Sequence, residues 1–310
     1  KHVEECRRVY EESLRQVIDV RALGYPELKC SAAAKRDNFP NVPEINFDDF
    51  EVSKTMLGQG SFSDVFEAVL PLTGKVAFKE LRIREGRDEL LNEAAAMWEV
   101  RHSDHVVQLL KVCTGKRVGL VMEFMEGGTL ANRLKTGPAL DKRQILEIFR
   151  DVLLGVAAIH ESKQVHLDLK SDNILVDAKG RAKVGDFGTC KQQRQTMRAT
   201  GALGTLRWLA PEMLLSSQPS SSCDVWSLGM LLYELVTRKV PYYELEESQV
   251  VRAITENKTP TIPNDVDKDI ILWMRMCWQR DPSKRPTARQ LLLEVNKALT
   301  RNCGVCLQDF

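Results

Sequence analysis

The pattern of apolar residues changes near residue 125, and this change restricts the folds open to the chain. Before that point, apolar residues fall in short runs that alternate or are rich in β-branched and aromatic side chains, separated by Gly or Pro-Leu-Thr-Gly turns. One helix is expected at about 88–100. We predict strands over 50–57, 64–70, 75–81, 106–113 and 118–124. The first part of the chain is therefore expected to form a small β-rich lobe.

Beyond Gly127-Gly128 the pattern becomes mainly helical. Asp141 is placed to cap a helix that runs to about Glu161, with apolar residues at helical spacing along it. The run Trp226–Val236 is apolar nearly all round, which predicts a helix buried in the centre of a larger lobe. We expect an α+β protein whose two lobes join near residue 125, with a ligand cleft between them.

Composition and charge narrow the function further. The 310 residues include 44 basic and 43 acidic side chains, a net charge of +1, and 43% are apolar. This is the composition of a globular enzyme. A net charge so close to zero gives no long-range electrostatic attraction for nucleic acid, so no nucleic-acid partner is expected. No apolar run approaches the roughly 18–20 residues of a membrane span. The start at Lys1, without a signal-peptide pattern, favours a fragment of a larger protein with flanking domains.

The two ends of the chain differ from its centre. Residues 1–28 carry apolar positions near helical spacing and predict an amphipathic helix, which either docks on the neighbouring domain or binds a partner. Residues 29–46 show little periodicity and are expected to form a linker. Six of the eight cysteines are scattered singly, as in a reduced intracellular (cytoplasmic) protein. Cys303 and Cys306 have metal-ligand spacing without a second pair, so the tail is either uninformative or the start of a RING-type zinc module.

Four motifs carry candidate chemistry. Glycines 58 and 60 would let the backbone approach a phosphate, but Ser63 and a following strand exclude a dinucleotide fingerprint. A lysine then ends a short apolar strand, an Asp- and Asn-containing loop precedes another apolar run, and an Asp-Phe-Gly triplet is followed by Ala-Pro-Glu. In chain order the motifs are Leu57-Gly58-Gln59-Gly60-Ser61-Phe62-Ser63-Asp64-Val65, Val76-Ala77-Phe78-Lys79, His166-Leu167-Asp168-Leu169-Lys170-Ser171-Asp172-Asn173, and Asp186-Phe187-Gly188 with Ala210-Pro211-Glu212.

Together, in this order and at these separations, the motifs resemble the signature set of eukaryotic protein kinases. The resemblance covers about residues 50–298 and extends to Asp224, which would anchor the catalytic loop, and to Arg285, which would pair with Glu212. Cys277-Trp278 and the stretch before Ala-Pro-Glu look like the tyrosine-kinase-like group, which includes the Raf and mixed-lineage kinases. The resemblance to protein kinases implies a bilobal fold with a small antiparallel β-rich N-lobe. The expected boundaries are 1–47 for the extension and linker, 48–125 for the N-lobe, 126–298 for the C-lobe and 299–310 for the tail.

The resemblance also implies a role for each matching residue. Asp168 would accept or orient the proton of the substrate hydroxyl, and Lys170 would place a positive charge beside the γ-phosphate of ATP. Lys79 would hold the α- and β-phosphates and be oriented by Glu93, with Glu89 and Glu99 as alternatives. Asn173 and Asp186 would supply oxygen ligands to Mg²⁺.

The nucleotide itself would lie between the glycine loop and the two lobes. The adenine slot needs apolar walls and backbone hydrogen bonds, and the same side chains would equally serve as core packing between the lobes. Met122 falls at the gatekeeper position, followed by a hinge whose backbone would face the purine. The residues expected to contact ATP are Leu57, Gly58, Gln59, Gly60, Ser61, Phe62, Val65, Ala77, Lys79, Met122, Glu123, Met125 and Leu175.

The implied function is a protein serine/threonine kinase. Lys170 and Thr205 match serine/threonine rather than tyrosine kinases. Leu167 replaces the arginine that usually receives an activation-segment phosphate, so we expect regulation by phosphorylation to be weak. The alternative is a pseudokinase that binds nucleotide and partners without turnover. An active enzyme is favoured over a pseudokinase because the set of catalytic and metal-binding residues is complete: Lys79, Asp168, Asn173 and Asp186 are all present.

Overall fold

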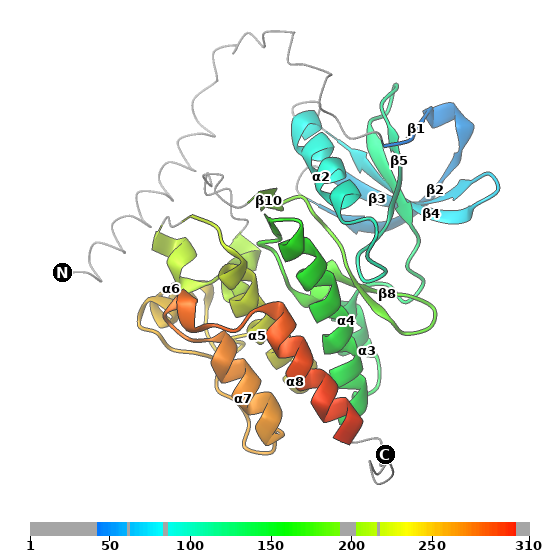
Figure 1. Cartoon of the computed structure of the whole chain (residues 1–310). Coiled ribbons are helices and arrows are strands. Elements are labelled where there is room, and N and C mark those ends of the chain that lie inside the picture. Colours follow the sequence, from blue (N-terminus) through cyan, green and yellow to red (C-terminus); the bar gives the residue numbers. More distant parts are fainter. Residues whose placement is uncertain (1–41, 61–62, 83–85, 193–202, 216–217, 302–310) are drawn as a thin grey trace.

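The computed structural model describes residues 42–60, 63–82, 86–192, 203–215 and 218–301. These residues form a β-rich N-lobe packed on a larger helical C-lobe (Figure 1). The predicted bilobal α+β fold is confirmed. The predicted helix over 1–28 and the Cys303–Cys306 pair lie outside the described residues.

A six-stranded sheet builds the N-lobe, in the order β1-β5-β6-β4-β3-β2. Neighbouring strands pair antiparallel, except for β1 and β5, which pair parallel. Phe50 and Phe78 stack edge to face at 5.1 Å between ring centroids and centre a small core on one face of the sheet. The strands are β1 (Glu44–Ile45), β2 (Glu51–Gln59), β3 (Ser63–Leu70), β4 (Gly74–Leu81), β5 (Leu109–Cys113) and β6 (Gly119–Glu123).

Helix α2 (Arg87–Glu99) is the predicted helix of this lobe. Its buried residues are Leu90, Glu93, Ala94 and Met97, which share one face because positions three and four apart coincide on a helix. Three of them belong to the large core that continues into the C-lobe. Glu93 is the one buried carboxylate on that face, and it therefore needs a cation as partner.

Two stretches of the N-lobe differ from the prediction. Glu44 and Ile45 form a strand where a linker was expected, because β5 presents an edge on which Glu44 pairs with Val112. Strand β5 begins at Leu109 rather than at residue 106. Val106 instead forms an isolated parallel bridge with Val184 of the C-lobe. Both differences depend on partners that are distant in the chain.

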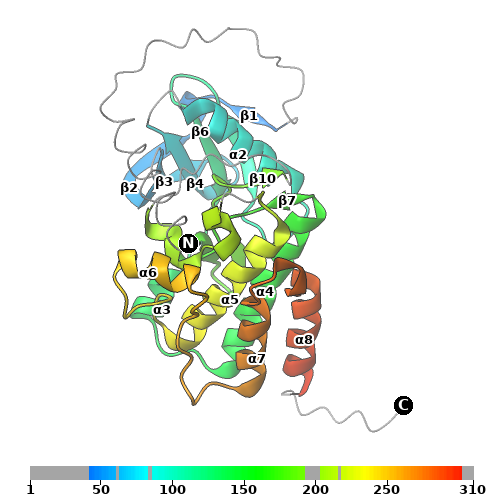
Figure 2. The ribbon, with the colours of Figure 1, turned by 90° about the vertical axis from the view of Figure 1, so that its left-hand side faces the viewer.

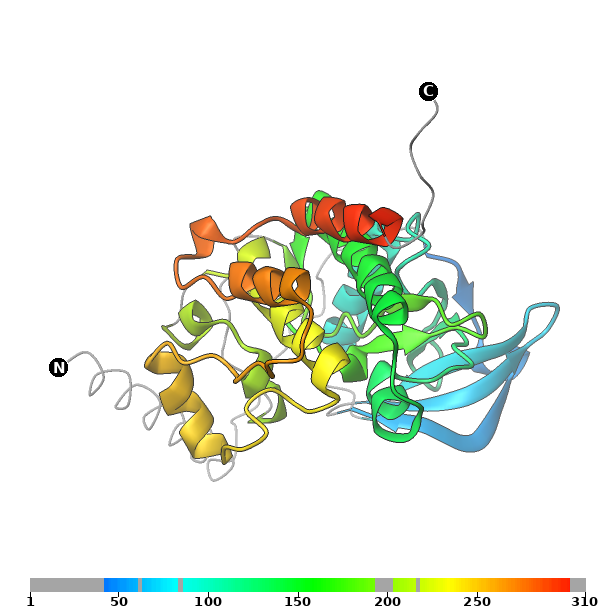
Figure 3. The same ribbon diagram turned by 90° about the horizontal axis from the view of Figure 1, so that it is seen from below.

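The helices of the C-lobe surround the buried helix α5 (Ser221–Thr237). Every residue from Cys223 to Leu235 is buried, as the mainly apolar character of this run predicts. Helix α4 (Lys142–Glu161) begins at the predicted cap, where the Asp141 carboxylate accepts from the Gln144 backbone N–H at 2.8 Å. Helix α4 runs beside α8 in Figures 1 and 3. The remaining helices are α3 (Leu130–Thr136), α6 (Glu247–Thr255), α7 (Lys268–Cys277) and α8 (Ala288–Arg301).

Short strands lie where the lobes meet, and Figure 2 shows two of them, β7 and β10. Strand β7 (Gln164–Val165) pairs with β10 (Lys191–Gln192), and β8 (Ile174–Val176) pairs with β9 (Ala182–Val184). Five 3₁₀ turns complete the described fold: η2 (Phe47–Asp49), η4 (Ser171–Asn173), η5 (Leu203–Trp208), η6 (Pro211–Leu215) and η7 (Pro282–Lys284). None of the helices among the described residues has the length and apolar character to span a membrane.

Candidate active site

Three charged side chains from three separate elements meet between the lobes. The Lys79 ammonium on β4 lies 2.6 Å and 2.9 Å from the two carboxylate oxygens of Glu93 on α2. It also donates to Asp186 Oδ1 at 2.9 Å. Of the glutamates considered for this pairing, Glu93 is the one that lies against Lys79. The arrangement joins the sheet, helix α2 and the Asp-Phe-Gly triplet at a single cation.

Burial and charge set the protonation of this group. Burial alone would lower the pKa of Lys79, but Glu93 and Asp186 raise it well above its usual range. The Lys79 ammonium lowers the pKa of Asp186 to about 2, against the opposing effect of burial. Lys79 is therefore a cation and Asp186 an anion throughout the neutral range. A fixed positive charge beside a fixed carboxylate suits the binding of phosphate and a divalent cation.

A second cluster lies in the loop after β7. The Lys170 ammonium donates to both Asp168 oxygens, at 3.0 and 2.9 Å. The Asn173 amide nitrogen donates to the Asp168 backbone carbonyl at 2.8 Å and to Asp168 Oδ2 at 2.7 Å. Asp168 is thus held from two sides by residues of its own loop. Its carboxylate is oriented before any ligand arrives.

Asp224 on α5 anchors the loop that contains Asp168, as the sequence predicted. Its two carboxylate oxygens accept from the backbone N–H groups of His166 and Leu167, both at 2.8 Å, and the His160 ring nitrogen lies 2.8 Å from Oδ2. Burial opposes ionisation, but the contact with His160 helps keep the pKa of Asp224 below its usual range. These bonds hold the backbone of Leu167 at a φ of 68°, a left-handed conformation that residues other than Gly rarely adopt.

Backbone contacts couple this loop to Asp186. The His166 ring nitrogen Nε2 lies 2.9 Å from the Gly185 carbonyl oxygen, and the Gly185 N–H donates to the Asn173 carbonyl at 2.8 Å. Phe187 is buried and stacks edge to face on His166, at 5.3 Å between ring centroids. The segments that carry Asp168 and Asp186 are therefore connected through their neighbouring residues.

Most residues predicted to hold a nucleotide lie on or beside strands β2, β3, β4 and β6 of the N-lobe sheet. Val65 on β3 pairs with Lys79, and Ala77 on β4 pairs with Met122 on β6. A methyl group on Gly60 would meet two Ser63 oxygens at 3.3 Å, so a side chain at this turn would require Ser63 to shift slightly. The predicted residues Leu57, Gly58 and Gln59 end strand β2, and Leu175 lies on β8. Ser61 and Phe62 lie outside the described residues.

The hinge contains an ion pair that the sequence did not predict. The Glu123 carboxylate, at the end of β6, accepts two bonds of 2.8 Å from the buried Lys183 ammonium of β9 and one of 2.7 Å from the Gln108 backbone N–H. The predicted hinge residue Met125 is buried below it. Glu123 thus ties the lobes together through its side chain. A lysine inside the short apolar run Ala182–Val184 was the only local signal.

A third network supports the end of the activation segment. Arg285 donates to both oxygens of Glu212, at 2.6 and 2.8 Å, so the predicted pair is present. The buried carboxylate of Glu234 on α5 accepts from Ser171 Oγ at 2.5 Å and from Trp208 Nε1 at 2.7 Å. Burial raises the pKa of Glu234 to about 7. Glu234 was not predicted, because nothing near it in the chain indicates its partners.

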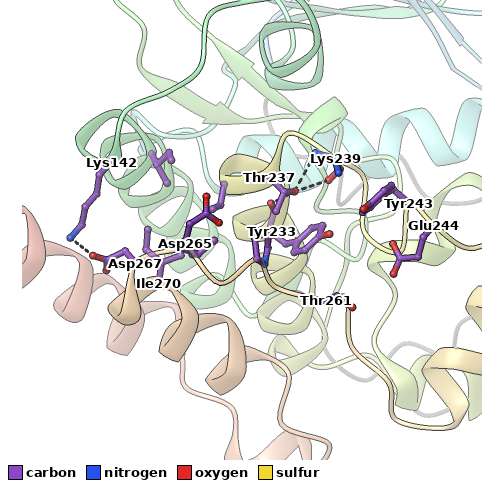
Figure 4. Close-up of a pocket in the computed structure, with 14 residues that line it drawn as sticks. Lys142, Tyr233, Thr237, Lys239, Tyr243, Glu244, Thr261, Asp265, Asp267 and Ile270 are labelled. Atoms are coloured by element: carbon purple, nitrogen blue, oxygen red, sulfur yellow. Dashed lines mark hydrogen bonds and ion pairs between the residues drawn. The ribbon is translucent and has the colours of Figure 1, made fainter.

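One cavity of the C-lobe contains none of the predicted site residues. It has a volume of about 850 Å³ and lies between the ends of α4, α5 and α7 (Figure 4). Tyr233, Tyr243 and Ile270 line it, and the ion pair between Lys142 and Asp267 (2.7 Å) borders it. The groups predicted to perform chemistry lie instead between the lobes.

Comparison with known proteins agrees with this geometry. The family described as protein kinase domain matches residues 51–295, most of the chain. The chain belongs to the protein kinase family. Several of its relatives are serine/threonine-protein kinases. The chain is 32% identical over 243 residues to a probable serine/threonine-protein kinase of Dictyostelium discoideum, covering 76% of this chain and 49% of the relative.

Other relatives of the kinase domain come from distant organisms. Serine/threonine-protein kinase PAK 4 of Homo sapiens is 32% identical over 259 residues, covering 82% of this chain and 43% of that protein. Mitogen-activated protein kinase kinase kinase 1a of Physcomitrium patens is 29% identical over 299 residues, covering 94% of this chain and 39% of that protein. The chain spans about half or less of the length of these curated relatives.

Proposed function

We propose that this kinase transfers the γ-phosphate of ATP, with Mg²⁺, to serine and threonine hydroxyls of protein substrates. The observation that carries the proposal is the convergence of Lys79, Glu93 and Asp186 at distances of 2.6 to 2.9 Å. The adjacent loop, in which Asp168 is held by Lys170 and Asn173, supports it. The names of the relatives support the choice of acceptor.

Each residue has a distinct role in this proposal. Lys79, oriented by Glu93, holds the α- and β-phosphates, and Lys170 places its charge beside the γ-phosphate. Asp168 accepts or orients the proton of the attacking hydroxyl. The transition state of phosphoryl transfer spreads negative charge over oxygen atoms, so positioning and fixed positive charge lower its free energy.

Asn173 and Asp186 fit a magnesium ion by their donor chemistry. The Asn173 amide nitrogen is committed to Asp168, which leaves its amide oxygen, and Asp186 is an ionised carboxylate. Both are hard oxygen ligands of the kind that Mg²⁺ prefers. When bound, the ion neutralises charge on the phosphate oxygens.

The proposal also covers the setting of the domain. The Gly-Thr-Leu-Arg-Trp stretch before Ala-Pro-Glu and the pair Cys277-Trp278 support membership of the tyrosine-kinase-like group. Scattered single cysteines support an intracellular location. The partial coverage of longer relatives supports flanking domains in the whole protein, with the N-lobe over 48–125 and the C-lobe over 126–298.

A phosphorylation assay on a peptide library, with ATP and Mg²⁺, tests the proposal. We expect transfer to peptides with serine or threonine acceptors and none to matched peptides with tyrosine, because Lys170 follows the serine/threonine pattern. Nucleotide binding without transfer to any peptide would favour the alternative, a pseudokinase. Transfer confined to tyrosine peptides would contradict the proposed specificity for serine and threonine.

The gatekeeper assignment makes a separate prediction. Met122 lies opposite Ala77 at the back of the proposed adenine slot, so Met122→Gly should open the space behind it. We expect a purine analogue with a bulky substituent to bind this variant at least about tenfold more tightly than it binds the unmodified kinase. Isothermal titration or inhibition of peptide phosphorylation measures the difference.

The unsubstituted purine is the control for this prediction, because it needs no space behind residue 122 and should bind both proteins with similar affinity. Met122→Ala should give an intermediate gain for the bulky analogue. If the bulky analogue binds the glycine variant and the unmodified kinase equally, Met122 is not the gatekeeper.

A further inference from the structure

A buried glutamine precedes the catalytic loop. Gln164 is the first residue of β7, two positions before His166, and only 4% of it is exposed. A buried amide has a donor and an acceptor to satisfy, and leaving either without a partner destabilises the fold. The partners of Gln164 come from two elements far away in the chain.

Those partners belong to helix α2 and to the start of the activation segment. The Gln164 oxygen accepts from the Cys190 thiol at 3.1 Å. Its amide nitrogen makes a longer contact, 3.5 Å, with the Ala96 carbonyl in α2. Figure 2 shows β7 and β10 together near α2, between the lobes.

The backbone around Gln164 adds to this junction. Gln192 pairs with Gln164 in the antiparallel β10–β7 ladder, and the Thr189 hydroxyl donates to the His166 carbonyl at 2.9 Å. The activation segment is therefore attached to the catalytic loop through neutral hydrogen bonds. No charged group takes part in these contacts of Gln164, Thr189 and Cys190.

Both partners of Gln164 are connected to the nucleotide site. Helix α2 carries Glu93, three residues before Ala96, and Cys190 follows Asp186 by four residues. A shift of either element would change the distances that join Lys79 to Glu93 and Asp186. Leu167, 9% exposed, offers no cation to a phosphate on the activation segment.

We propose that Gln164 is a positioning residue, which holds α2 and the activation segment in the catalytic arrangement through its contacts with Ala96 and Cys190. The clamp, meaning Gln164, Cys190 and the Ala96 carbonyl, acts without phosphorylation. Its kinetic consequence rests on the proposed transfer activity. Its structural consequence, protection of the Cys190 thiol, does not.

The test compares Gln164→Met with the unmodified chain in two measurements. Methionine has nearly the same length and no amide, so it removes both contacts while filling the space. We expect kcat for peptide phosphorylation to fall about tenfold or more, with a smaller change in KM for the peptide, since loss of buried hydrogen bonds displaces catalytic groups. The melting temperature is measured alongside.

Alkylation by iodoacetamide, followed by mass spectrometry of each cysteine, reports the clamp directly. We expect Cys190 to react about fivefold faster or more in Gln164→Met, because its thiol loses a hydrogen-bond partner in a partly buried position. The buried thiols of Cys113, Cys223 and Cys277 serve as internal references and should keep their rates. Gln279→Met, the same change at an exposed glutamine on the C-lobe, should alter neither measurement.

A second pair of variants keeps the proposal testable if Gln164→Met does not fold. Cys190→Ser retains a donor for the Gln164 oxygen, whereas Cys190→Ala removes it, so the serine variant should retain clearly more activity. In the Gln164→Met background, Cys190→Ala should cause little further loss of activity, since both substitutions break the same contact. Equal activity of the serine and alanine variants would overturn the clamp, as would unchanged kcat and unchanged Cys190 labelling in Gln164→Met. If the unmodified chain transfers no phosphate, the proposed function fails, and the labelling still decides the clamp.

Discussion

Asp186→Asn is expected to lower the rate of phosphoryl transfer by at least about a hundredfold, the size of loss seen when one preorganised charge is removed from a catalytic site. Asp186 is ionised at neutral pH and lies 2.9 Å from Lys79. Asparagine has nearly the same volume but no charge, so it weakens the hold on Mg²⁺. A peptide phosphorylation assay at saturating ATP measures the change.

The fold should survive this substitution. The Asp186 side chain is about half exposed (48%), and Lys79 keeps both of its bonds to Glu93, so the melting temperature should change little. Asp265→Asn is the matched control, because Asp265 is exposed and borders the C-lobe cavity rather than the site between the lobes. Turnover close to normal in Asp186→Asn would show that Asp186 is not a metal ligand and would contradict the proposed mechanism.

Arg285→Met should destabilise the C-lobe by about 3 kcal/mol, the cost of leaving a buried charge without its partner. The Arg285 side chain is fully buried and donates to Glu212, to the Ser222 carbonyl at 2.9 Å and to the Gln279 carbonyl at 2.8 Å. Methionine fills much of the space but satisfies none of these oxygens. Thermal unfolding followed by fluorescence should show a melting temperature about 10 °C lower.

The position of the arginine decides this effect. Arg289 also forms an ion pair, with Glu161, but both members of this pair are exposed. Arg289→Met should leave the melting temperature essentially unchanged, since exposed ion pairs add little. Glu212→Met should recover part of the loss in the Arg285→Met background, because it removes the unpaired carboxylate. Equal effects at Arg285 and Arg289 would show that burial of the pair does not matter.

Much of the architecture could be predicted from local signals. The capping box of Asp141 and Gln144 lies within four consecutive residues, and the apolar character of α5 belongs to one continuous run. The loop from His166 to Asn173 could be named for the same reason, because its chemistry is contained in eight adjacent residues. The roles given to these residues remain predictions.

Other features could not be predicted because they depend on contacts across the fold. Strand β1 exists only because β5 offers it an edge, and Val106 pairs with Val184 rather than extending β5. The ion pair between Glu123 and Lys183 joins residues 60 positions apart. Neither Glu123 nor Lys183 has a neighbour in the chain that indicates the other.

The sequence by itself determined the two lobes, the buried central helix and the motifs that identify the family, because each is encoded in the spacing of nearby residues. Only the tertiary structure decided which glutamate meets Lys79 and which groups satisfy Gln164 and Glu234. The physical reason is that a buried polar side chain must find its partner wherever packing places one. That partner is chosen by the approach of whole helices and strands, which no local pattern records.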